Sequence, residues 1–231
     1  MVYNIDMQKL LSVALDVPLN KLFDYHCDDN KAMVGSRVKV PFGASTRIGL
    51  IVEINDIGRK KNNYKIKNIY ELLDERPVLS NELLKTSKWA ATYYHYPIGQ
   101  VLFNSMSPIH RKGNNEPKRV LREASMTKPT ALKLNDEQLR VSNDIYKNIH
   151  KYQVNYLRGV TGSGKTEVYT NLAANILNND GQILIMVPEI NLTPQTVSRF
   201  KKYLTINPQE YHSNLTPSQK FKVWKACRED K

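Results

Sequence analysis

The sequence predicts two architectures in succession: a small β-rich domain, then part of a P-loop parallel α/β lobe. Short apolar segments separated by turn-forming residues run from residue 10 to residue 73. After residue 132, apolar segments alternate with helical patterns, and a glycine-rich loop lies between the first segment and a helix. The first pattern is typical of small β domains and the second of parallel sheets. We therefore expect the α/β plus β class, with domains at residues 1–106 and 132–231.

Five segments of the first domain have the short length and β-branched content of strands. They are Ser12–Val17, Leu22–His26, Arg37–Pro41, Arg47–Ile54 and Lys65–Leu73. Turn formers separate them at residues 28–30, 41–43 and 56–58. This spacing predicts a small barrel or an open β domain.

A helical pattern follows, with Ser80 as its predicted N-cap. The residues on its apolar face are Leu83, Leu84, Ser87, Ala90, Ala91 and Tyr94. Pro97 is expected to end this helix, and Ile98–Phe103 to form a short one. Residues 107–131 predict a basic linker, because Pro, Gly and Asn interrupt them and little there could bury a core.

The second domain begins near Leu134. Its predicted helices are Asn135 to about His150, Lys165 to about Asn178, Thr193–Leu204 and Thr216–Arg228. Its predicted strands are Val154–Leu157, which is expected to be buried, and Gln182–Val187. In the first helix we expect Leu139, Ile145 and Ile149 to face inward.

The charge balance favours a polyanionic partner. Lys and Arg number 34 against 22 Asp and Glu, which gives a net charge of +12. Nucleic acid is the first such partner to consider, and an ordinary lysine-rich protein is the alternative. Cys27 and Cys227 are isolated, so this segment predicts no zinc cluster. No apolar run is long enough to span a membrane, so we expect no membrane contact and a cytoplasmic protein.

Residues 159–166 carry the phosphate-loop pattern G-x-x-x-x-G-K-[ST] between an apolar segment and a helix. Its members are Gly159, Val160, Thr161, Gly162, Ser163, Gly164, Lys165 and Thr166. Glycines permit the backbone angles that turn N–H groups toward phosphate oxygens, and the helix N-terminus adds partial positive charge. We expect Lys165 to reach the β- and γ-phosphates of ATP and the Thr166 hydroxyl to ligate Mg²⁺.

Hydrolysis needs an acidic strand to hold the metal and help position water. No apolar strand that ends in paired acids follows Val187. Glu189 fits a loop or a helix start better than this role. Whether the chain is itself an enzyme is therefore an open question.

At this point the chain resembles the primosomal protein N′ family, the bacterial replication-restart DNA helicases of superfamily 2. The phosphate-loop run Gly159–Tyr169 is the most specific match. Further resemblance lies in Val13–Tyr25, Arg37–Gly43, Arg47–Val52, Trp89–Ala91, Tyr93–Gly99, Leu134–Gln138, Val187–Gln195, His212–Thr216 and Trp224. The resemblance implies a 3′-end DNA-binding domain followed by a RecA-like helicase lobe, with Gln138 contacting the adenine.

The same resemblance implies a pocket for the 3′ end of a nascent strand, formed by Phe23, Asp24, Tyr25, Gly43 and Lys67. An aromatic ring can stack on the terminal base, and a carboxylate can accept hydrogen bonds. Implied partners are forked DNA, primosome proteins and single-stranded-DNA-binding protein. Implied cofactors are ATP and Mg²⁺; the full-length family also carries zinc, outside this segment.

The chain departs from the family pattern in three places. About twenty residues stand where the family usually has a winged-helix domain, which we expect to be absent. The acidic helicase box, the zinc-binding cysteines and the second motor lobe are not found before Lys231, which indicates an N-terminal portion. Asn214 replaces an expected Gly. The alternatives are a non-catalytic DNA-end-binding or regulatory module and, from another class, a P-loop kinase or transporter ATPase.

Several features have two interpretations. The aromatic residues Trp89, Tyr93, Tyr94 and Tyr96 could stack on bases, but packing in the core is the preferred reading. Basic residues between Arg111 and Arg122 suit either phosphate contact or a solvated tether. His212 fits a structural or motor-coupling role better than a metal ligand. Gln138 fits either an adenine contact or a plain surface position.

Overall fold

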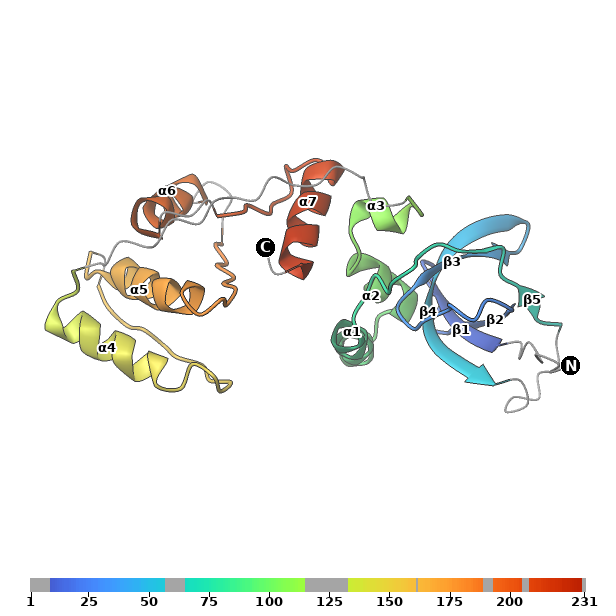
Figure 1. Ribbon diagram of the computed structural model, residues 1–231, viewed down its shortest axis with the longest axis horizontal. Coiled ribbons are helices and arrows are strands. Elements are labelled where there is room, and N and C mark those ends of the chain that lie inside the picture. The colour runs from blue at the N-terminus through green and yellow to red at the C-terminus, as the bar shows by residue number, and fades with distance from the viewer. Residues whose placement is uncertain are drawn as a thin grey trace, which may run out of the picture. The chain divides into compact units, whose positions relative to one another are not determined.

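The computed structural model describes residues 9–56, 65–114, 133–160, 162–188, 193–204 and 208–229. The chain falls into two compact units, Met1–Arg119 and Val120–Lys231. The boundary between the units lies within the segment predicted to be a linker. Each unit is described by itself below (Figure 1).

The first unit is built on a six-stranded sheet in the order β5-β2-β1-β4-β3-β6. The strands are β1 (Lys9–Leu15), β2 (Phe23–Cys27), β3 (Arg37–Phe42), β4 (Ser45–Asp56), β5 (Lys67–Asn68) and β6 (Glu71–Leu72). All paired strands are antiparallel except β2 and β5, which run parallel. The first four predicted strands are confirmed. Lys65–Leu73, predicted as one strand, is instead two short strands at opposite edges.

The curl of this sheet brings its two edges together (Figure 1). Asn68 in β5 and Glu71 in β6 are three residues apart, so at most about 10 Å of chain connects the edges. Between them, the Ile69 amide donates to the carbonyl of His26 in β2 at 3.0 Å. The next amide, that of Tyr70, donates to the carbonyl of Lys39 in β3 at 2.8 Å. These two hydrogen bonds close the sheet into a small barrel.

Alternating side chains of the strands fill the interior of this barrel. The buried core cluster consists of Leu11, Val13, Leu15, Val17, Tyr25, Cys27, Ala32, Val38, Val40 and Ile51. Side chains on the opposite face, such as Leu10, Ala14 and Leu50, are also buried. The helix α2 contacts β1, and a Cβ at its Gly99 would lie 1.7 Å from the Leu15 carbonyl oxygen. A glycine is therefore needed for the helix to approach the strand.

Three helices follow the strands: α1 (Asn81–Tyr93), α2 (Ile98–Asn104) and α3 (Pro108–Arg111). Ser80 caps α1 as predicted, because its side chain accepts a hydrogen bond from the Leu83 amide at 3.2 Å. The predicted second helix is confirmed as α2. Tyr94, expected on the apolar face, is 68% exposed, because α1 ends before it.

The start of the predicted linker belongs to the folded unit, which corrects that prediction. Ser107 and His110 are buried, and Ser107 caps α3. The guanidinium of Arg37, 1% exposed, donates to the carbonyls of His110 at 3.0 Å and Asn114 at 2.9 Å. A buried guanidinium needs acceptors for all its donors, so it holds residues 107–114 against the sheet. The rest of the linker, including Lys118, Arg119 and Arg122, lies outside the described residues.

The described part of the second unit contains the helices α4 (Asp136–Tyr146), α5 (Lys165–Leu177), α6 (Thr193–Leu204) and α7 (Pro217–Arg228). All four predicted helices are confirmed, although α4 ends four residues before His150. Asn135 and Thr216 cap α4 and α7 with reciprocal capping boxes. A small core forms around Ala173, Phe200 and Leu204. Leu139 is 46% exposed, so the prediction that it faces inward is wrong.

The two predicted strands of this unit are extended but pair with no described strand. Their side chains are exposed: Val154 by 82%, Tyr156 by 88%, Leu184 by 84% and Met186 by 85%. The prediction of a buried strand at Val154–Leu157 is therefore wrong for this structure. A strand becomes buried only through partners on its edges and faces, and no described strand pairs with the edges of these two segments. The predicted parallel sheet is not present among them.

Candidate nucleotide and DNA sites

The phosphate loop leads directly into α5. Gly164 is the N-cap of this helix, with φ of 81°, and Gly162 has φ of 83°. Both values lie in the left-handed region that favours glycine. The first turn of α5 therefore begins at Lys165, next to the loop. Thr161 lies outside the described residues.

The ammonium group of Lys165 folds back across the loop. Its Nζ donates to the carbonyl oxygens of Gly159 at 2.7 Å and Val160 at 2.8 Å. These contacts hold a positive charge over the concave side of the turn. A triphosphate would compete with the two carbonyls for this group, and charge-assisted bonds to phosphate are the stronger kind.

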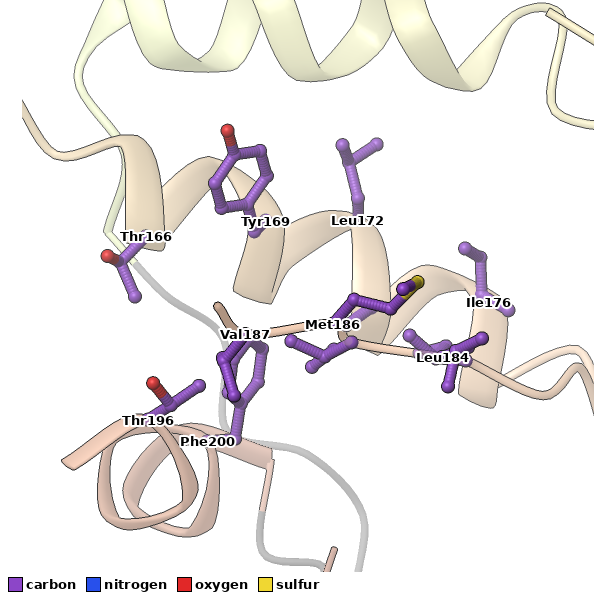
Figure 2. Close-up of a pocket in the computed structure, with 12 residues that line it drawn as sticks. Thr166, Tyr169, Leu172, Ile176, Leu184, Met186, Val187, Thr196 and Phe200 are labelled. Atoms are coloured by element: carbon purple, nitrogen blue, oxygen red, sulfur yellow. The ribbon is translucent and has the colours of Figure 1, made fainter. Parts of the chain in front are cut away.

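Thr166 lies at one end of an open groove of about 500 Å³ (Figure 2). The groove is lined by α5, residues 183–187 and α6, with mostly apolar side chains. Figure 2 shows Thr166 and Thr196 at the same end, with Leu172, Ile176 and Leu184 farther along. A triphosphate needs polar donors, so this apolar groove is not itself the phosphate site. Thr166, at one end of the groove, is also the last residue of the phosphate loop, so its hydroxyl lies beside that loop.

Gln138 contacts the phosphate loop directly. Its Nε2 donates to the carbonyl of Ser163 at 3.3 Å, and its Oε1 accepts from the Asn135 amide at 3.0 Å. The glutamine is therefore placed beside the loop, and its contact with the adenine stays a prediction.

Two of the five residues implied to bind a DNA 3′ end, Phe23 and Gly43, lie near each other through Phe42. The ring of Phe23 packs edge-on against Phe42, with centroids 5.1 Å apart, and Gly43 follows Phe42 in the β3–β4 turn. Gly43 has φ of 59°, and a Cβ there would meet nothing within 4 Å. Lys67 is exposed and pairs with Tyr25 in the β2–β5 ladder.

Tyr25 and Asp24 point to opposite faces of β2, because side chains alternate along a strand. Tyr25 is 5% exposed, and its hydroxyl donates to the Pro41 carbonyl at 2.9 Å. Burial raises the pKa of this phenol. Tyr25 therefore supports the β3–β4 turn from the core. Asp24, on the other face, accepts a hydrogen bond from the Ser12 hydroxyl at 3.0 Å.

A surface aromatic cluster was misjudged from the sequence. Trp89, Tyr93, Tyr94 and Tyr96 are 58%, 63%, 68% and 48% exposed, so the preference for core packing is wrong. Trp89 and Tyr93 stack at 5.1 Å, and Tyr93 meets Tyr94 edge-on at 4.9 Å. The buried residues of α1 are Leu84, Ser87 and Ala91, and the helical period places Trp89 and Tyr93 opposite them. That period could have revealed their exposure.

Metal-binding groups and membrane-spanning helices were sought among the described residues alone. Among them, no group of three or more His, Cys, Asp or Glu side chains could hold a metal ion. No helix there combines the length and the apolar character that crossing a bilayer requires. Glu189 lies outside the described residues, so its predicted loop position stays a prediction.

Comparison with known families matches each unit separately. Residues 12–107 match the family described as 3′DNA-binding domain (3′BD) of PriA. Residues 131–229 match the family described as type III restriction enzyme, res subunit. The first match covers the barrel from Ser12 onward with the helices α1 and α2, and the second covers the phosphate loop and the helices α4 to α7.

Relatives named replication restart protein PriA cover nearly the whole chain. The protein of Haemophilus influenzae is 29% identical over 95% of this chain and 40% of its own length. That of Borreliella burgdorferi is 32% identical over 94% of this chain and 33% of its own length. The Treponema pallidum protein is 29% identical over 96% of this chain and 34% of its own length. The chain thus spans about a third to two fifths of these relatives, and over that length it belongs to the PriA family of replication restart proteins.

Proposed function

We propose that the first unit binds the 3′ end of a DNA strand at a stalled replication fork. The observation that carries this proposal is the match of residues 12–107 to a 3′DNA-binding domain. The geometry supports it: the half-buried ring of Phe23 lies against Phe42, next to the unobstructed turn at Gly43, and the exposed Lys67 lies in β5 beside β2. An aromatic edge, close backbone approach and a cation suit a base, a sugar and a phosphate respectively.

Fluorescence titration with labelled strands tests this site. Strands that end in a 3′-hydroxyl are expected to bind more tightly than strands that end in a 3′-phosphate. Lys67→Ala should weaken binding of both and lower the salt dependence by about one phosphate contact. Lys31→Ala, an exposed lysine in the β2–β3 loop, is the matched control. Equal affinity for the two kinds of end would remove the pocket assignment.

We further propose that the second unit binds ATP with Mg²⁺ through Gly159–Thr166. Lys165 would exchange its two carbonyl contacts for the β- and γ-phosphates, and Thr166 would ligate the metal. In a protein with both motor lobes, ATP hydrolysis would then drive 3′-to-5′ unwinding and allow the primosome to be reloaded. Forked DNA, primosome proteins and single-stranded-DNA-binding protein are the partners this role requires.

Lys165→Ala tests the phosphate loop. Loss of the ammonium group is expected to abolish ATP binding in calorimetry, because it removes the cation that lies across the loop and would bond the phosphates. The circular dichroism spectrum should stay that of the wild type, since Lys165 is only partly buried. ATP binding that survives the change unaltered would remove the role of Lys165.

A second candidate function is a DNA-end-binding or regulatory module without catalysis. It is favoured by the segments 154–157 and 183–187, which join no sheet among the described residues of the second unit. A DNA-stimulated ATPase assay on the chain separates the two candidates. Turnover supports the motor role, and DNA binding without turnover supports the module.

We also propose that the usual winged-helix domain is absent. The alignment with the Haemophilus influenzae protein extends over 297 positions, more than the 231 residues of this chain. That relative therefore carries residues, within the aligned region, that have no counterpart here.

A further inference from the structure

Gln138 is bonded at both ends of its side-chain amide. It is the third residue of α4, and its Oε1 accepts the Asn135 amide at 3.0 Å. The Asn135 side chain returns the bond by accepting the Gln138 amide at 2.8 Å. The other end, Nε2, donates to the carbonyl of Ser163 in the phosphate loop at 3.3 Å.

The chemistry of the two partners fixes the orientation of the amide. The backbone N–H of Asn135 is a donor, so the amide oxygen must face it. The nitrogen then faces the loop, where the Ser163 carbonyl is an acceptor. The side chain of Gln138 thus joins the start of α4 to the loop.

Two further observations show that this contact is built closely. A Cβ at Gly164 would lie 2.0 Å from Nε2 of Gln138, so a side chain there would displace the glutamine. The helices α4 and α5 are also joined by a hydrogen bond between their side chains. Asn171 in α5 donates to the buried hydroxyl of Ser142 in α4 at 2.9 Å. This second bond keeps α4 at a set distance from α5, and so keeps Gln138 at the loop.

We propose that Gln138 is a positioning residue for the phosphate loop. By holding the Ser163 carbonyl, it fixes the peptide unit between Ser163 and Gly164, whose N–H points away from that carbonyl and is thereby directed toward a triphosphate. The inference rests on the proposed nucleotide binding and differs from the adenine contact that the family resemblance implies. It makes Gln138 act on the phosphates, whatever base the nucleotide carries.

Inorganic triphosphate separates the two roles, because it has no base. Calorimetry with Mg²⁺ would compare its affinity with that of ATP in the wild-type chain and in Gln138→Ala. Loss of one positioning hydrogen bond is expected to weaken both ligands equally, by about fivefold to tenfold. Gln219→Ala is the matched control: Gln219 forms the same capping box with Thr216 at the start of α7. It should leave both affinities unchanged.

A weaker affinity for ATP with an unchanged affinity for triphosphate would overturn the proposal in favour of base contact. Unchanged affinity for both would overturn it as well. Hydrogen exchange of the amides at residues 159–166 gives a readout that needs no ligand. Exchange should be faster in Gln138→Ala than in Gln219→Ala, and equal rates would reject the positioning role. If the wild-type chain bound neither ligand, the nucleotide proposal would fail, while the exchange rates would still decide the role of Gln138.

Discussion

Arg37 is the largest fully buried side chain among the described residues. It pairs with Asp74 at 2.6 Å, and the Asp74 carboxylate also accepts the Arg37 backbone amide at 2.7 Å. The remaining guanidinium donors reach carbonyls at residues 110 and 114. One side chain thus joins β3, the segment after β6 and the end of α3.

Arg37→Met is expected to destabilise the protein by about 3–5 kcal/mol, because it leaves Asp74 buried without its charged partner. Urea unfolding measures this change. Lys39→Met, two residues along the same strand, removes an exposed pair with Glu71 and should cost less than about 1 kcal/mol. Equal losses of unfolding free energy in the two variants would show that the buried ion pair stabilises the protein no more than the exposed one.

Tyr25 gives a pH dependence. Burial raises its pKa above the ordinary 10.0, so the unfolded chain releases this proton at a lower pH than the folded chain. Its contribution to stability is therefore complete below about pH 10 and declines as the pH rises toward the folded-state pKa. Tyr25→Phe should show a smaller loss of unfolding free energy between pH 9 and 11 than the wild type. A parallel decline in both proteins would contradict this.

At the scale of elements, α1 has one buried face and one exposed aromatic face. Leu84→Ala is expected to cost about 2–5 kcal/mol, because it opens a cavity under the buried face of α1. Trp89→Ala should change stability by no more than about 0.5 kcal/mol, since the ring lies on the surface. Thermal unfolding of the two variants compares the faces directly, and a large loss in Trp89→Ala would place the ring in a core.

Local patterns predicted the elements that local physics determines. The caps at Ser80, Asn135 and Thr216 were evident, because each side chain bonds within its own first turn. The helix α3 was missed, since it is held by Arg37, seventy residues away in sequence. The strand at Val154–Leu157 was predicted wrongly, because alternation and apolarity do not show whether a partner strand exists.

The candidate sites follow the same division. The glycines and Lys165 lie within eight residues, so their loop could be predicted from the sequence. The contact between Gln138 and Ser163 joins α4 to the phosphate loop, and only the resemblance suggested that the two were neighbours. The opposite orientations of Asp24 and Tyr25 follow from strand alternation, yet they become visible only once β2 is placed in its sheet.

At the scale of the whole molecule, the two units differ in how well they are packed. Among the described residues, the barrel core cluster of the first unit has ten buried members, whereas the cluster around Phe200 in the second unit has three. The second unit should therefore unfold first on heating. Residues 1–119 expressed alone should keep the higher of the two midpoints in calorimetry. If the whole chain unfolded in a single transition and residues 1–119 alone showed no transition, the two units would not be independent.

The two successive amides of Ile69 and Tyr70 have a consequence for association between molecules. A row of unpaired strand amides is a template on which another chain can add a strand. Because the amides of Ile69 and Tyr70 are already bonded to strands at the two edges of the sheet, a neighbouring molecule cannot pair with them by adding a strand. Proline at residue 70 would remove one of these donors and expose such a template, so we expect that variant to form oligomers by β-strand addition.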